Sequence, residues 1–224
     1  MVKRVNLEAG NIFRVKLLNG MYVFGHIVFF VPRRNKKRYQ EINSESYLRG
    51  FLSNCMLVDI YSQISYSEVL ERKEVFFKGV FFSSSDLSTM SEDVITVIEN
   101  EKVDVKGVEF PETIGADQDG LFLQRGELKI KLDDVKKDVQ EELLKYPDSF
   151  KDVYSVADGV LFFQNRQSEM QRNYYEGWKH TQNDLKNDTE LRLKVYAKIG
   201  EDPNQSYYEL ALKHGFDLAR LYEK

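Results

Sequence analysis

The fold is indicated first by residues 13–27, which read Phe13-Arg14-Val15-Lys16-Leu17-Leu18-Asn19-Gly20-Met21-Tyr22-Val23-Phe24-Gly25-His26-Ile27. Apolar residues alternate with basic ones from position 13 to position 17, which is the two-residue period of a half-buried strand. The Asn-Gly pair that follows tolerates positive φ and is typical of a tight hairpin turn. A two-residue turn predicts that one face of the hairpin carries Phe13, Val15, Leu17, Tyr22, Phe24 and His26.

Further strands are predicted up to about residue 132. Apolar stretches cover residues 55–61, 75–82 and 94–98, and a second hairpin is expected where residues 121–124 and 127–132 flank Arg125-Gly126. Asp117-Gln118-Asp119-Gly120 is interpreted as the turn that precedes it. Because the period is mostly two residues, the N-terminal half is expected to form a twisted antiparallel β-sheet or an open barrel.

The pattern changes at Asp133. A helix is predicted from there through Lys145, and another from Asp202 or Asn204 through about His214, with Gly215 as its left-handed cap. Apolar and polar residues alternate over 191–199, as in a strand, but the Gly200 and Pro203 that follow fit the end of a helix. Whether this segment is a strand or a helix is therefore left open. The sequence thus predicts an α+β fold with helices concentrated in the C-terminal third. Residues 1–132 are expected to form a mainly β domain, and residues 133–224 a mixed or helical region packed on it.

The composition is that of a globular protein. The chain has 224 residues, of which 42% are hydrophobic and 30% are charged. The longest apolar run, residues 27–31, is far shorter than a bilayer span, and no signal peptide is visible, so a cytoplasmic protein is expected. The single cysteine excludes an intramolecular disulfide and a cysteine-based zinc site.

Charge is unevenly distributed along the chain. Residues 1–40 hold nine basic side chains and one acidic one, whereas residues 83–119 hold ten acidic and two basic ones. The two segments either neutralise each other inside the fold, or one of them faces outward and steers a charged partner. A nucleic-acid-binding domain usually has a pI above about 9. The pI of this chain is near 5.6, which makes nucleic acid the weaker choice of partner.

Residues that could carry out catalysis are few, and no phosphate-binding loop, dinucleotide fingerprint or nucleophile elbow is present. Cys55 lies in an apolar strand and is interpreted as a buried thiol. Structural roles are assigned to His26 and His214, and the helical spacing of His180 and Asp184 lacks a third group. No catalytic residue, metal site or cofactor is expected, and a small hydrolase ranks third among the functions considered.

The first hairpin resembles the opening of the immunity protein 26 family. The family pattern is a Gly-Asp-x-Phe-x-x-x-x-Leu strand, a glycine-containing turn and a Tyr-x-x-Gly-x-Val strand. Asn11 replaces the usual Asp, Lys16 stands where Pro is common, and residues 107–111 loosely suit the second half of the family. The likeness covers about the first 130 residues, and its matching positions are Gly10, Phe13, Leu17, Gly20, Tyr22 and Gly25.

Members of that family are mainly β proteins encoded beside bacterial polymorphic toxins, which they are thought to neutralise by binding. The resemblance implies a cytoplasmic, non-catalytic protein whose partner is a cognate toxin. The oligomeric state is not predicted. The resemblance supplies no contact residues. On the basis of charge alone, the predicted partner-binding residues are Arg33, Arg34, Lys36, Lys37 and Arg38. The alternative function is that of a nucleic-acid-associated protein using the basic N-terminal region.

Overall fold

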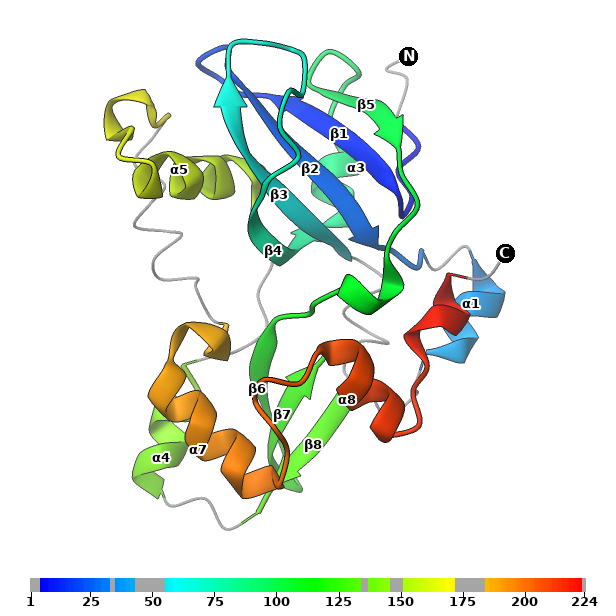
Figure 1. Ribbon diagram of the computed structural model, residues 1–224, viewed down its shortest axis with the longest axis vertical. Coiled ribbons are helices and arrows are strands. Elements are labelled where there is room, and N and C mark those ends of the chain that lie inside the picture. The colour runs from blue at the N-terminus through cyan, green and yellow to red at the C-terminus, as the bar shows by residue number, and fades with distance from the viewer. Residues whose placement is uncertain are drawn as a thin grey trace. The chain divides into compact units, whose positions relative to one another are not determined.

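The computed structural model describes residues 5–32, 35–42, 55–133, 137–145, 151–171 and 184–222 (Figure 1). The fold is α+β, as predicted. The chain forms two compact units, the first made of Met1–Phe30, Asn54–Val103 and Phe150–Thr181. The second is made of Val31–Ser53, Asp104–Ser149 and Gln182–Lys224. Both units draw residues from either side of the expected boundary between residues 132 and 133.

The first unit contains a five-stranded antiparallel sheet in the order β4-β3-β2-β1-β5. Each predicted strand of this region is confirmed, and no barrel closes among the described residues. The strands are β1 (Asn11–Lys16), β2 (Tyr22–Phe29), β3 (Cys55–Ser65), β4 (Val75–Ser83) and β5 (Ile95–Asn100).

The β1–β2 hairpin is present, but its register differs from the prediction by one residue. The Leu17 N–H donates to the Met21 carbonyl, so the loop has three residues, 18–20, rather than two. Gly20 has a positive φ of 84°. A three-residue hairpin loop commonly ends with a left-handed residue, and the Asn-Gly pair fits this turn as well as the shorter one.

The shifted register changes which side chains share a face, because a one-residue slip moves a whole strand to the other side. His26 lies opposite Ile12, and Phe13 lies opposite Gly25. The expected grouping on one face of Phe13, Val15 and Leu17 with Tyr22, Phe24 and His26 is therefore wrong. A Cβ at Gly25 would come within 2.8 Å of the Phe13 ring, so glycine is required by this close approach.

Both faces of strand β2 are covered. One face packs with α5 (Val153–Phe163) and its core contains Phe13, Val15, Val23, Ile27, Val58, Val156, Ala157 and Val160. The other face carries a smaller cluster of Ile12, Tyr22, Phe24 and Tyr61, against which Leu70 packs. Figure 1 shows α5 beside β3 and β4. This unit also contains α3 (Ser84–Thr89) and η3 (Gln167–Glu169).

The second unit contains a three-stranded antiparallel sheet in the order β6-β7-β8. The second predicted hairpin is confirmed, but Arg125 still belongs to the strand and pairs with Leu128, so the turn is Gly126-Glu127 rather than Arg125-Gly126. The turn at residues 117–120 is confirmed. The strands are β6 (Glu112–Asp117), β7 (Gly120–Arg125) and β8 (Leu128–Leu132). The helices are α1 (Lys36–Glu41), η2 (Val105–Gly107), α4 (Lys137–Leu143), η4 (Leu185–Asn187), α7 (Thr189–Ile199), α8 (Tyr207–Lys213) and η5 (Leu218–Leu221).

Capping residues decide the helix boundaries of the second unit. Residues 191–199, whose type the sequence did not decide, belong to helix α7. The helix begins after Asp188, whose side chain accepts from the Leu191 N–H, and it ends at Gly200, which has a left-handed conformation. Helix α8 starts at the Ser206 capping box, later than the predicted Asp202 or Asn204. Helix α4 overlaps the helix predicted over 133–145. None of the described helices is long and apolar enough to cross a membrane.

Candidate functional site

The basic residues nominated from charge lie on or beside helix α1. Lys36 and Lys37 are exposed and Arg38 is partly buried, whereas Arg33 and Arg34 lie outside the described residues. The side chain of Asn35 caps the helix by accepting from the backbone N–H of Arg38. Two nominated side chains thus face solvent from one short helix.

The cysteine and the histidines occupy separate places. Cys55 is buried at the start of β3. His26 lies on β2 opposite Asp59, and its Nε2 is buried without a hydrogen-bond partner in the described structure. His214 ends helix α8, with Nε2 3.0 Å from the Glu201 carboxylate. His180 lies outside the described residues. Within the part of the chain that the structure covers, no three His, Cys, Asp or Glu side chains gather as metal ligands would.

Five acidic residues of segment 83–119 form ion pairs among the described residues, and the partners of these five are not the basic residues of segment 1–40. In the first unit, Lys73 pairs with both Glu99 and Glu101. In the second unit, the pairs are Glu109 with Arg125 and Lys186, Glu112 with Arg125 and Arg192, and Asp117 with Lys129. Mutual neutralisation of the two charged segments is not seen among the described ion pairs.

A buried ion network in the second unit joins the sheet to helix α7. Glu112 has no exposed surface, and both of its oxygens accept from the Arg192 guanidinium. The Tyr196 hydroxyl also donates to Glu112 Oε1, at 2.8 Å, and Arg125 Nη1 lies 3.5 Å from the same oxygen. Burial raises the pKa of Tyr196 above its usual value. Because every member holds another member in place, we interpret this network as a structural one.

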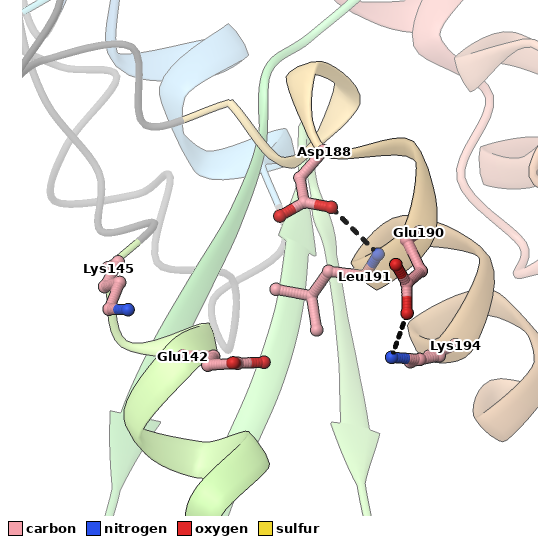
Figure 2. A pocket seen from close by; sticks show the side chains of 6 residues that line it. All are labelled: Glu142, Lys145, Asp188, Glu190, Leu191 and Lys194. Atoms are coloured by element: carbon pink, nitrogen blue, oxygen red, sulfur yellow. Dashed lines mark hydrogen bonds and ion pairs between the residues drawn. The ribbon is translucent and has the colours of Figure 1, made fainter.

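A shallow depression with a volume of about 250 Å³ lies on the surface of the second unit (Figure 2). Figure 2 shows Glu142 and Lys145 on one side and Glu190 and Lys194 on the other. The Glu190 carboxylate accepts from Lys194 one helical turn away, and Asp188 caps helix α7. These groups serve the helix on which they lie, so the depression offers no converging chemistry.

The first unit has a larger groove, of about 540 Å³. It lies along the last residues of β3, the connection from β3 to β4 and the residues that follow α5. Its lining residues are Ser62, Gln63, Ile64, Ser65, Ser67, Glu71, Arg72, Glu74, Phe76, Gln164 and Arg166. We refer to these residues as the β3 groove.

The β3 groove exists because β3 is longer than its neighbour β4. Tyr61 pairs with Val75, the first residue of β4, whereas β3 continues to Ser65. The Ser62 N–H still reaches the Glu74 carbonyl, at 2.8 Å, and beyond this point β4 supplies no partner. On its other side this stretch stays paired with β2, through Val23 and Ile64. The floor of the groove is therefore a strand paired on one side.

Side chains from the end of α5 cover the backbone of this strand edge. Gln164 Nε2 donates to the Ser62 carbonyl at 2.7 Å, and Arg166 Nη1 donates to the Ile64 carbonyl at 2.9 Å. The Arg166 guanidinium is also held by Glu169 through two bonds of 2.7 Å. Side-chain donors thus satisfy carbonyl groups that a continuing strand would otherwise satisfy.

The connection from β3 to β4, residues 66–74, is attached to the sheet at several points. The Gln63 amide bonds the backbone of Val69, Glu71 and Arg72. Glu68 accepts from the Tyr22 hydroxyl and pairs with Arg14, and these contacts lower the pKa of Glu68. Together with the Lys73 pairs at Glu99 and Glu101, these bonds order one wall of the β3 groove.

The segments that line the β3 groove carry exposed apolar side chains. Tyr66, Val69, Val75 and Phe163 keep 68%, 64%, 42% and 48% of their surfaces exposed, and each belongs to one of these segments. The centroid of the Phe163 ring lies 6.4 Å from that of the Phe76 ring and 6.1 Å from that of the Phe77 ring. Aromatic groups bordered by polar ones are characteristic of protein-binding surfaces.

Sequence reasoning did not identify this groove. The sequence signal for the groove is the polar run from Ser62 to Ser67 after an apolar strand, together with Gln164 and Arg166. These two residues are 102 residues away along the chain from their carbonyl partners.

No family model, curated protein or solved structure matches the chain.

Proposed function

We propose that this chain is a non-catalytic binding protein of the bacterial cytoplasm that neutralises a cognate toxin by direct contact. The first support is the resemblance of residues 10–25 to the immunity protein 26 family. The glycines in that pattern are required by the local backbone of this fold. Gly10 and Gly20 have positive φ, and a Cβ at Gly25 would collide with the Phe13 ring.

The observation that carries the proposal is the β3 groove with its exposed apolar side chains. The groove is concave, its polar lining is held by hydrogen bonds, and aromatic rings beside it are half exposed. Such a surface can bury a partner's side chains. The rings are held by one another, since Phe163 packs on Phe76 and Phe77. Binding would therefore cost little side-chain entropy at these positions.

The basic residues of α1 are proposed to assist encounter with the partner. Lys36 and Lys37 are exposed, and no ion pair engages them within the described residues. Exposed charge speeds association at low salt and contributes less to the lifetime of a complex. Changing Arg33, Arg34, Lys36, Lys37 and Arg38 to serine should slow association at low salt by about tenfold and leave dissociation unchanged. Equal association rates would contradict this role.

The test of the proposal is co-expression with the product of a neighbouring toxin-like gene. The chain should restore growth and should co-purify with that product. Toxicity that persists at full expression of a folded chain, with no complex formed, would contradict the proposal. If the chain instead bound DNA or RNA with an affinity that fell steeply with salt, the nucleic-acid alternative would be supported.

A further inference from the structure

We propose that the β3 groove binds a basic segment of the protein partner, with an arginine or lysine side chain entering the groove. This proposal rests on the proposed function in supposing a protein partner. It goes further by naming the surface and the chemistry of the segment that binds there.

Charge complementarity is the first argument. Glu71 and Glu74 line the groove and form no ion pair within the described residues; the Glu74 carboxylate accepts only from the Ser62 hydroxyl, at 3.3 Å. Of the two arginines in the lining, Arg166 is already neutralised by Glu169. Arg72 is left as the unpaired cation of the lining. With Arg166 neutralised by Glu169 from outside the lining, two carboxylates face one unpaired cation, so the described groove has one net negative charge and favours a cationic occupant.

The floor and sides of the groove also present hydrogen-bond acceptors. Ser62 and Ile64 line it, and their carbonyl groups already accept from the Gln164 amide and the Arg166 guanidinium. Arg166 shows how a guanidinium is accommodated at this edge, because it bonds a strand carbonyl and a carboxylate at the same time. A planar guanidinium with several N–H donors suits such a set of acceptors.

The apolar border completes the match to a basic side chain. Arginine and lysine bury their methylene groups on apolar surface while their charged ends remain at polar groups. A cation also gains energy over an aromatic face, by about 1 kcal/mol at exposed sites. Phe76 lines the groove, and the Phe163 ring lies against it. Because Gln164 and Arg166 already bond the carbonyl groups of the strand edge, the occupant is expected to bind through its side chains rather than by adding a strand.

The experiment is selection of short random peptides displayed on phage against the immobilised full chain. Peptides enriched on the unaltered chain should be rich in arginine and lysine. The double variant Glu71→Gln and Glu74→Gln keeps the shape of both side chains but removes their charge. It should weaken the selected peptides by about tenfold, measured by titration calorimetry at low salt.

A matched control is available in the second unit. Glu142→Gln with Glu190→Gln removes the same charge from another acid-lined depression, that of Figure 2. The control should leave peptide affinity unchanged. The proposal is overturned if no peptide is enriched, if acidic or uncharged peptides dominate, or if both double variants weaken binding equally.

Two further outcomes separate this proposal from others. If the chain forms a dimer that Glu71→Gln and Glu74→Gln dissociate in sedimentation, the occupant is a second copy and the proposal of a foreign segment is wrong. The selection uses no toxin, so basic peptides that bind the groove while co-expression fails to protect cells would contradict the proposed function alone.

Discussion

The carboxylate of Glu112 is fully buried and accepts two hydrogen bonds from the guanidinium of Arg192, at 2.6 Å and 2.8 Å. Their elements lie far apart in sequence, on β6 and α7. A paired buried charge adds little net stability, but an unpaired one is costly because its desolvation is no longer offset.

Arg192→Met should therefore destabilise the protein by about 3 kcal/mol, because it leaves Glu112 with only Arg125 and Tyr196 as partners. The free energy of unfolding from urea titration measures the change. Lys194→Ala serves as the control, since its exposed pair with Glu190 should contribute less than about 1 kcal/mol. Equal effects of the two variants would show that the buried pair has no special role.

Gly126 is expected to be the least replaceable glycine of the second hairpin. Its φ is +57°, and a Cβ there would overlap the Tyr207 ring. Gly200→Ala is the matched control, because Gly200 has a φ of +71° and nothing within 4 Å of an added Cβ. Both variants should lose about 1 kcal/mol to backbone strain. Gly126→Ala should lose about 2 kcal/mol more to the overlap, and similar thermal shifts for the two variants would refute this assignment.

Stability should depend on pH through Glu109. Burial alone would raise its pKa, but Lys186 and Arg125 outweigh burial and hold the pKa of Glu109 below its ordinary value of 4.5. A lowered pKa in the folded state contributes stability that is present above pH 4.5 and is lost as the pH falls below it.

The cost of Glu109→Gln should therefore be largest near neutral pH and should shrink on acidification. Unfolding titrations of both proteins at pH 7 and pH values below 4.5 measure the difference. Asp184 acts in the opposite sense, since burial raises its pKa, but it is present in both proteins and cancels from the comparison. A cost that does not change with pH would contradict the assignment.

Phe163 is expected to contribute to partner binding rather than to stability. It is 48% exposed, and Phe163→Ser should weaken the toxin complex by at least about tenfold while changing stability little. Leu212→Ser is the control, because Leu212 on α8 is 51% exposed and lies in the second unit. A loss of affinity that is the same for both variants would remove Phe163 from the binding surface.

Local patterns predicted most of the strands and helices α4 and α8, but they missed strand β6 and helix α5 and did not give the details of strand pairing. Residues 13–27 specify a hairpin, yet β2 is apolar on both faces, so its pattern could not choose between two registers that differ by one residue. In segment 191–199, the capping residues Asp188 and Gly200 outweighed the alternation, which leaves Leu193 exposed on the helix. Propensity and alternation are weak where caps and packing on both sides decide.

The candidate site was beyond the reach of local patterns. The β3 groove depends on the difference in length between β3 and β4, and on donors from Gln164 and Arg166 after α5. Neither feature is visible in a short window of sequence. The basic residues 33–38 stood out because they are contiguous, whereas the residues of the groove come from three separate segments.

The most direct test of the whole account is amide hydrogen exchange of the chain with and without the neighbouring toxin. The account predicts that binding slows exchange mainly in residues 62–76 and 162–166, the segments that form and border the β3 groove. Slowed exchange confined to other segments, such as residues 35–42 around helix α1, with none along β3 and its connection to β4, would contradict it.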